Sequence, residues 1–328
     1  MERFALAAAV VLGFALTAAL CSLFVPLRRV LERREQNQQP VQPEQPRPVP
    51  LRAPLWGGLC AAAGTVAAGW LAACVGQPEL LGSEGRLMTR LLTALAGSLA
   101  FGAVGLAEDL ARMRSPAALG LRRDVRLLLE ALAAAFVLLL LQAAGCLPRG
   151  LDVPGAGYVL LGSAVPFLWA VLMVALAECA RIAERDEGTV CGAAFVAMLA
   201  LMMAEAGLGV PGLAVLPAAL AGALVALLLW AFPPARLGVG CCGSLLAAGA
   251  IGCIPLSLDM TSLTVPLALP FWATGGLLAA QLLCAKRTGK PLRCWVKKHK
   301  MSPETVFLCS FALSAVGYVL ALALLRWC

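Results

Sequence analysis

Six acidic residues stand beside the ends of two long apolar segments, and they are the first candidates for chemistry in this chain. They fall near residues 108 and 178–187, in the order Glu108, Asp109, Glu178, Glu184, Asp186 and Glu187. A carboxylate at membrane depth is costly, so such residues usually face a polar cavity or a partner group. In a cavity of this kind a carboxylate can serve as a base or orient a reacting group.

Basic residues gather on the same side of the apolar segments as these carboxylates. Of the 26 lysines and arginines, 21 fall in alternate loops, which follow the first, third, fifth, seventh and ninth apolar segments. By the positive-inside rule these loops are cytoplasmic and both termini are extracytoplasmic. The acidic clusters and the basic loops therefore meet at one face. This predicts a cytoplasm-facing site for an anionic substrate beside the lipid headgroups.

Ten apolar segments must position these residues, and each has about the 20 residues that a membrane-spanning helix needs. Their ranges are 4–26, 55–75, 89–108, 126–145, 160–178, 189–206, 211–232, 238–257, 262–285 and 303–326. The chain is 61% hydrophobic and only 13% charged, whereas soluble domains carry about 25% charged residues. This composition excludes a soluble or nucleic-acid-binding protein. It predicts an all-α, multi-pass helical bundle in the plasma membrane.

We expect one transmembrane domain over residues 1–328, with two long cytoplasmic loops. The loop at 27–54 contains a Pro/Gln-rich stretch at 35–50, which predicts an extended, mobile segment. The loop at 286–302 is basic, which predicts contact with anionic headgroups of membrane lipids. Nearly all of the 13 cysteines lie inside apolar segments. We therefore expect packing residues rather than disulfides or a zinc site.

Four cytoplasmic segments resemble, in order, those of the polyprenyl-phosphate N-acetylhexosamine-1-phosphate transferases, which are of the glycosyl transferase family 4 type. Residues 53–58 read APLWGG, similar to that family's TPTMGG. Residues 105–130 read GLAEDLARMRSPAALGLRRDVRLLLE, which resembles its aspartate-pair segment and the basic stretch that follows. Residues 234–245 read PARLGVGCCGSL, similar to PAKVFMGDTGSL, and residues 289–296 stand where the family has three histidines. The resemblance covers nearly the whole chain.

The resemblance implies a reaction and a set of partners. Members of the family move a phospho-sugar, such as phospho-N-acetylmuramoyl-pentapeptide, from a UDP-sugar to undecaprenyl phosphate. They release UMP, use Mg²⁺ and serve peptidoglycan precursor synthesis. Carried over to this chain, the resemblance makes Asp109 and Glu108 the catalytic carboxylates and Glu184 a metal ligand. The substrate-binding residues that it implies are Arg52, Arg122, Arg126, Arg181 and Glu187. It also implies a homodimer, and no nucleic-acid partner is expected.

Several positions depart from the family's pattern. The first aspartate of its pair becomes Glu108, and a metal-binding aspartate becomes Cys241. The three histidines become Arg293, Cys294 and Trp295. A thiol is a soft ligand, whereas Mg²⁺ takes oxygen ligands in near-octahedral geometry. An alternative therefore stays open, in which the chain is a catalytically inactive relative that binds polyprenyl phosphate or partners in envelope synthesis.

Overall fold

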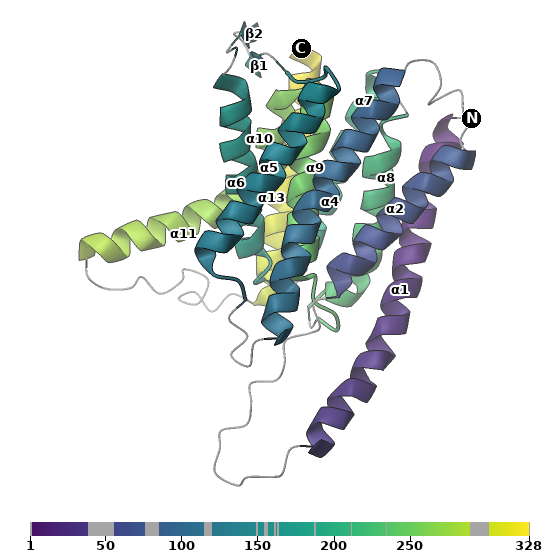
Figure 1. Cartoon of the computed structure of the whole chain (residues 1–328), viewed down its shortest axis with the longest axis vertical. Helices are drawn as coiled ribbons and strands as arrows, with labels where there is room; N and C mark the ends of the chain where they lie inside the picture. The colour runs from purple at the N-terminus through teal and green to yellow at the C-terminus, as the bar shows by residue number, and fades with distance from the viewer. Residues whose placement is uncertain are drawn as a thin grey trace.

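A computed structural model describes residues 2–38, 56–75, 85–114, 120–148, 150–153, 157–160, 162, 164–186, 188–210, 212–233, 235–288 and 302–327. Its helices are α1 (Glu2–Gln38), α2 (Gly57–Val75), α4 (Gly85–Arg114), α5 (Arg123–Ala143), α6 (Ala164–Ala183), α7 (Thr189–Gly207), α8 (Val215–Ala231), α9 (Gly240–Ser257), α10 (Thr264–Leu267), α11 (Leu269–Thr288) and α13 (Pro303–Trp327). Each apolar segment predicted from the sequence falls on these helices (Figure 1). The start of α1 and the end of α13 lie at the same end of the bundle.

The described residues form a multi-pass helical membrane protein. Six helices are long and apolar enough to cross a membrane, namely α1, α4, α6, α7, α9 and α13. The bent pair α10–α11 would be a seventh, and shorter apolar stretches lie at Gly57–Leu71 in α2 and at Val215–Ala231 in α8. Large apolar side chains such as Trp70, Phe167 and Leu308 lie exposed on the outside of the bundle. An apolar surface of this kind suits contact with lipid.

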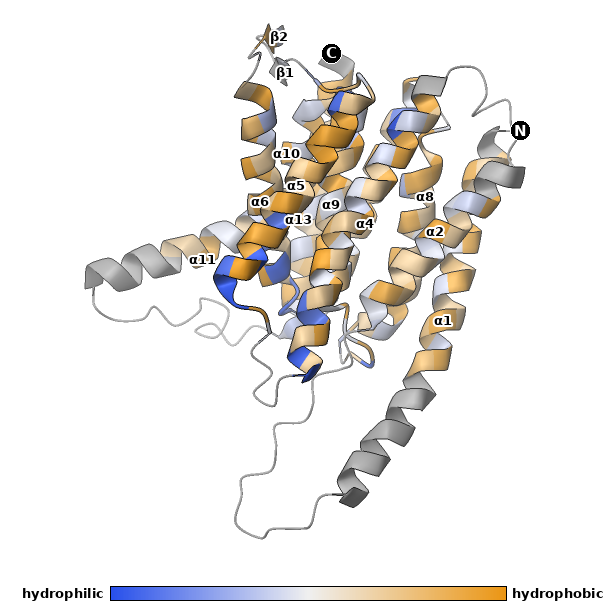
Figure 2. Ribbon diagram, in the orientation of Figure 1, coloured by the Kyte–Doolittle hydropathy of each residue, from blue (hydrophilic) through white to orange (hydrophobic). Residues whose placement is uncertain are grey.

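Charged side chains gather at the end of the bundle opposite the start of α1 and the end of α13. Figure 2 shows the most hydrophilic colouring at the lower ends of α4 and α5. Consecutive helices alternate in direction, so α4 and α6 end there while α5, α7 and α9 begin there (Figure 1). The segments that carry the predicted functional residues therefore meet at one end.

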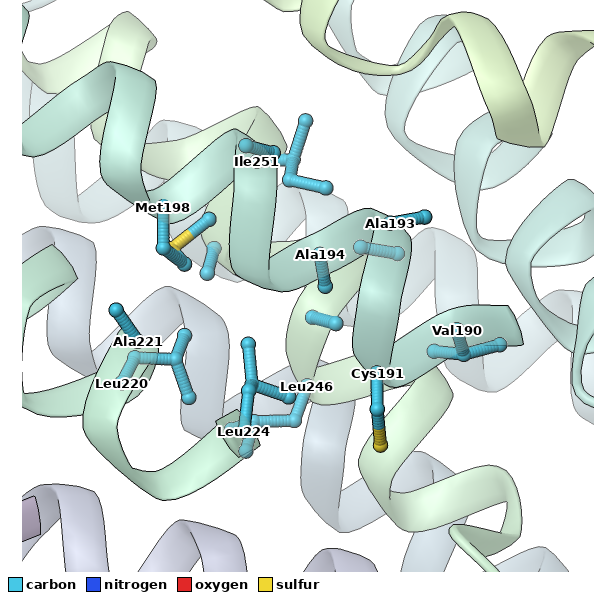
Figure 3. Close-up of a cluster of buried hydrophobic side chains, with 14 of the residues drawn as sticks. Val190, Cys191, Ala193, Ala194, Met198, Leu220, Ala221, Leu224, Leu246 and Ile251 are labelled. Atoms are coloured by element: carbon cyan, nitrogen blue, oxygen red, sulfur yellow. The ribbon is translucent and has the colours of Figure 1, made fainter. Parts of the chain in front are cut away.

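Helix α9 is the centre of the bundle. All of its residues are buried, and α2, α4, α6 and α7 pack against it. Its sequence, GCCGSLLAAGAIGCIPLS, is rich in small residues, which allow neighbouring helices to approach closely in a membrane. Figure 3 shows the apolar side chains that α7, α8 and α9 bring together, among them Met198, Leu220, Leu224, Leu246 and Ile251.

The protein is mostly helical, as the sequence predicts, but two of the predicted segments differ in detail. A small antiparallel hairpin, β1 (Gly150–Val153) and β2 (Gly157–Leu160), precedes α6, so this helix begins at Ala164 rather than at residue 160. The predicted segment 262–285 is not one straight helix. It consists of a 3₁₀ turn, η1 (Thr261–Leu263), then α10 and α11, with a bend of 63°. Pro266 and Pro270 explain the break, since proline lacks the N–H donor and disfavours a helical residue before it.

The predicted loop boundaries also shift. Helix α1 continues to Gln38, so residues 27–38 are helical rather than part of a loop, and residues 39–55 lie outside the described residues. Leucine, arginine, glutamate and glutamine form helices well, and no proline interrupts the chain between residues 27 and 38. Helix α11 likewise continues to Thr288, and residues 289–301 of the predicted basic loop lie outside the described residues.

Candidate functional site

Helices α4 and α9 touch backbone to backbone where α9 begins. A Cβ at Gly105 would lie 2.7 Å from the backbone nitrogen of Cys242, which leaves no room for any side chain larger than glycine's hydrogen. Asp109 stands one helical turn further along α4, on the same face as Gly105. The close approach therefore carries the Asp109 carboxylate to the first turn of α9.

The Asp109 carboxylate caps α9. The backbone N–H of Cys241 donates to Oδ1 of Asp109 at 3.0 Å, and that of Cys242 donates to Oδ2 at 2.8 Å. Asp109 is only 1% exposed. The first N–H groups of a helix lack partners within it and carry partial positive charge, so a carboxylate stabilises them. Gly240, with a left-handed φ of 73°, makes the turn that presents these two N–H groups.

The start of α2 docks on the same turn. The backbone N–H groups of Gly57 and Gly58 donate to the carbonyls of Gly238 and Val239, at 3.3 and 2.9 Å. A Cβ at Gly58 would lie 2.6 Å from the Cα of Gly243. The glycines of the APLWGG segment and of the PARLGVGCCGSL segment are therefore spatial neighbours, and their lack of side chains permits the contact.

The Arg112 guanidinium lies among three carboxylates from α4 and from the turn after α6. Its Nη2 donates a hydrogen bond to Oε1 of Glu108 at 2.7 Å. Its Nη1 lies 3.7 Å from Oε2 of Glu184 and 3.9 Å from Oδ1 of Asp109. The Cys241 thiol donates to the same Glu184 oxygen across 3.5 Å. One guanidinium thus neutralises carboxylates that are separated by 75 positions in the sequence.

Arg126, in the first turn of α5, connects three helices. Its Nε donates to Oε1 of Glu178 on α6 at 2.8 Å, and its Nη1 lies 3.6 Å from Oε1 of Glu108 on α4. Glu130, one turn along α5, has its Oε1 3.9 Å from the same Nε. Arg181 donates to the other oxygen of Glu178, Oε2, at 2.6 Å. These contacts offset the cost of burying Glu108 and Glu178, whereas both oxygens of Glu130 are buried without a hydrogen-bond partner among the described residues.

We call these side chains together the arginine–carboxylate cluster: Glu108, Asp109, Arg112, Arg126, Glu130, Glu178, Arg181 and Glu184. Six of the residues predicted from the sequence belong to it: Glu108, Asp109, Arg126, Glu178, Arg181 and Glu184. Arg122 does not, because it is exposed just before α5 and makes no ion pair with the cluster in the described part of the chain. Arg52 and Glu187 lie outside the described residues. The roles predicted for all of these residues remain predictions.

Sequence reasoning missed Arg112 and Glu130. An arginine at the end of a span, like Arg112, has an ordinary role in orientation, and Glu130 stands inside an apolar segment away from the other acidic residues. The signal was present as spacing, since Glu108–Arg112 and Arg126–Glu130 are opposite charges four residues apart. Residues at this spacing are neighbours on a helix. The spacing alone could not show that the two pairs meet each other.

Asp186, in the turn after α6, is a further carboxyl group whose pKa is shifted by burial. Desolvation raises the pKa of Asp186 above its ordinary value, and the neighbouring Arg185 opposes part of that rise. Asp186 therefore stays neutral to a higher pH than a solvated aspartate does.

The carboxylates of the site do not suit Mg²⁺. Both oxygens of Asp109 already accept backbone hydrogen bonds, and Glu184 shares its Oε2 with the Cys241 thiol. Oε2 of Glu108 is buried without a hydrogen-bond partner among the described residues, but Arg112 holds the other oxygen of that carboxylate. A Mg²⁺ ion 4 Å from that guanidinium would be repelled by about 8 kcal/mol at an effective dielectric constant of 20. Within the described residues, no three His, Cys, Asp or Glu side chains are placed to hold a metal ion.

The fold and the site together define a multi-pass membrane protein with a charged, largely buried site at one end of its helical bundle. The sequence model for glycosyl transferase family 4 matches residues 91–259, which is more than half of the 328 residues. The matched region includes the whole arginine–carboxylate cluster and α9. The chain belongs to glycosyl transferase family 4.

Three bacterial proteins named phospho-N-acetylmuramoyl-pentapeptide-transferase are similar to this chain. The protein of Mycobacterium tuberculosis strain H37Rv is 28% identical over 266 residues, covering 72% of each chain. That of Geobacillus kaustophilus is 25% identical over 307 residues, covering 92% of this chain and 89% of its own. That of Desulforudis audaxviator is 32% identical over 170 residues, covering 49% of this chain and 50% of its own. These matches agree with a transferase that serves peptidoglycan precursor synthesis.

Proposed function

We propose that this protein transfers a phospho-sugar from a UDP-sugar to a polyprenyl phosphate at the cytoplasmic face of the plasma membrane. In this reaction a phosphate oxygen of the lipid attacks the β-phosphorus of the nucleotide. The bond from that phosphorus to the bridging oxygen breaks, and UMP leaves with the bonding electrons. The products are UMP and a lipid-linked sugar diphosphate.

One observation carries the proposal: the ends of α4 and α6 and the starts of α5 and α9 join in a single polar site. Asp109 ties α4 to α9, and Arg126 ties α4 to α5 and α6. Two anionic phosphates must approach each other in the reaction, so positive charge is needed to offset their repulsion. Arg112, Arg126 and Arg181 are the cations of the cluster. The basic residues around the end of α4 support placing it in the cytoplasm.

The finer parts of the proposal rest on the relatives and on the charge distribution. The names of the relatives favour UDP-N-acetylmuramoyl-pentapeptide as the sugar donor, with undecaprenyl phosphate as the acceptor. The distribution of lysine and arginine favours ten spans with both termini extracytoplasmic. The start of α1 and the end of α13 lie at the same end of the bundle, away from the cluster, as that topology requires (Figure 1). A homodimer remains a prediction from the family resemblance.

A second candidate function is favoured by the pairing inside the cluster. Each of its carboxylates contacts an arginine, and that of Asp109 also accepts hydrogen bonds from two backbone N–H groups. A site neutralised in this way could hold a lipid phosphate without performing a reaction. The second candidate is therefore a non-catalytic relative that binds polyprenyl phosphate or an envelope-synthesis partner.

The test is formation of the lipid-linked product by the full-length protein in liposomes. Undecaprenyl phosphate would be supplied with UDP-N-acetylmuramoyl-pentapeptide or UDP-N-acetylglucosamine, in the presence of Mg²⁺, beside an Asp109→Asn variant. Product above the level of that variant supports transfer, and the preferred donor identifies the sugar. No product from either donor, while undecaprenyl phosphate still binds, supports the second candidate. Thermal unfolding of both proteins would show that the variant is folded.

A further inference from the structure

Two contacts, with Glu108 and with Gly120, hold the Arg112 side chain among the carboxylates. Its guanidinium is held by Glu108 on its own helix. Gly120, in the connection to α5, packs against its aliphatic stem: a Cβ at Gly120 would lie 3.0 Å from Cγ of Arg112 and 3.3 Å from its Nε. Gly120 has a left-handed φ of 70°, which favours glycine at that position. Gly120 therefore lies against Arg112 and restricts where its side chain can lie.

This placement puts a positive charge where the acidic residues of the site converge. Within 4 Å the guanidinium nitrogens reach carboxylates from α4 and from the turn after α6. A divalent cation shared by these carboxylates would have to occupy the same space. The position that would supply a further oxygen ligand holds Cys241, whose thiol is hydrogen-bonded to Glu184. The charge that a metal would bring is thus already supplied by the chain.

Arg112 also keeps hydrogen-bonding capacity for a ligand. A guanidinium carries five N–H donors, and of its contacts within the cluster only the one to Glu108 is as short as a hydrogen bond. The side chain is 21% exposed, whereas that of Glu108 is only 2% exposed. A planar guanidinium pairs well with phosphate oxygens, often through two parallel hydrogen bonds.

We infer that Arg112 takes the place of a divalent cation in this site, and that a nucleoside diphosphate is bound there through guanidinium hydrogen bonds without a metal. The role of Arg112 as the internal cation rests on the geometry of the cluster. The identity of the ligand rests on the proposed function. Removal of Arg112 should leave Glu184 without its cationic partner in the cluster and leave Glu108 paired with Arg126 alone, so the site should attract a hard cation more strongly.

The test of the first part uses Mn²⁺, a hard cation whose binding is followed by electron paramagnetic resonance. The full-length protein in lipid nanodiscs would be compared with Arg112→Ala, Arg112→Lys and the control Arg114→Ala, an exposed arginine on the same helix. We expect the wild type, Arg112→Lys and Arg114→Ala to bind Mn²⁺ weakly. Arg112→Ala should bind it at least about tenfold more tightly. Adding Glu108→Gln to Arg112→Ala should reverse the gain. Equally tight binding by the wild type and by Arg112→Ala would overturn the inference.

The second part is tested by calorimetric titration of the same proteins with UDP. The wild type should bind UDP equally well in excess EDTA and in Mg²⁺, and Arg112→Ala should lose at least about tenfold in affinity in EDTA. Binding that appears only with Mg²⁺ would overturn the metal-free mode. Absence of UDP binding under every condition would contradict the proposed function. The Mn²⁺ comparison would still test the role of Arg112 as internal cation, because it does not depend on the identity of the ligand.

Discussion

At the scale of single residues, the carboxylates of the cluster differ in what holds them. Asp109 is held by two backbone N–H groups of α9, Glu178 by two arginines, and Glu108 by arginines on α4 and α5. A buried carboxylate left without such partners would be costly. Each contact therefore stabilises the fold as well as shaping the site, and the two roles can be separated by the choice of substitution.

Replacing Asp109 with alanine should destabilise the protein because it leaves two buried N–H groups at the start of α9 without an acceptor. The expected loss in the free energy of unfolding is about 1–3 kcal/mol. Asp109→Asn should lose less, since an amide oxygen still accepts one hydrogen bond. Unfolding in detergent micelles would measure both variants against Asp124→Ala, an exposed acid in the first turn of α5. A loss for Asp109→Ala no larger than for Asp124→Ala would contradict the capping role.

Replacing Arg126 with methionine should be more damaging, because it removes one cationic partner from carboxylates on three helices, those of Glu108, Glu130 and Glu178. Breaking one side of a buried ion pair costs about 3–5 kcal/mol. Arg123→Met, an exposed site in the same turn, should change the free energy of unfolding by less than about 0.5 kcal/mol. The double variant Arg126→Met with Glu178→Gln should lose less than the sum of the two single losses. Strict additivity would show that the two side chains do not interact.

The residues of the site were predictable only in part from the sequence. Glu108, Asp109 and Glu184 stand out as acids beside apolar segments. Arg112 does not, because an arginine at the cytoplasmic end of a span has an ordinary role in orientation. Its place among three carboxylates depends on how α4 packs against the end of α6. No local pattern in the sequence encodes that packing.

At the scale of elements, glycines determine how closely the helices of the site approach. Gly105 permits α4 to touch the start of α9, and Gly58 permits α2 to touch the same turn. Both belong to segments in which the family resemblance was found, so part of that resemblance reflects packing rather than chemistry.

The sequence predicts that a helix exists more readily than it predicts where that helix is interrupted. The hairpin before α6 and the bend after α10 interrupt segments that hydropathy alone treats as uniform.

Gly105→Ala should destabilise the protein by about 1–3 kcal/mol, because the added methyl group must push α9 away from α4. Gly69→Ala is the matched control, since a Cβ at Gly69 on α2 would meet nothing within 4 Å. That control should be neutral or stabilise by about 0.5–1 kcal/mol, as glycine is a poor helix former. Thermal unfolding in micelles would compare the two. Equal effects would mean that the helices do not approach as closely as the structure shows.

At the scale of the whole molecule, the positions of the charged residues and the arrangement of the helices distinguish the same two ends of the bundle. The start of α1 and the end of α13 lie at one end, and the arginine–carboxylate cluster lies at the other (Figure 1, Figure 2). The sequence predicted this separation from the positions of lysine and arginine alone.

The proposed topology predicts where reporter proteins fused to this chain become active. Alkaline phosphatase, which folds only outside the cytoplasm, should be active when fused after residue 328 and inactive when fused at residue 115, between α4 and α5. A fluorescent protein that matures only in the cytoplasm should show the reverse pattern. Activity of the phosphatase at residue 115 would place the cluster outside the cytoplasm and contradict the proposed function.

The central claim is that the cluster is the substrate site of a phospho-sugar transferase that uses its own arginine in place of a metal. UMP release in excess EDTA tests it most directly, with liposomes that contain the protein, undecaprenyl phosphate and the preferred UDP-sugar. We predict that the wild type and Arg114→Ala release UMP at rates unchanged by EDTA, and that Arg112→Ala in EDTA releases none. Release by the wild type only when Mg²⁺ is present, or no release under any condition, would contradict the claim.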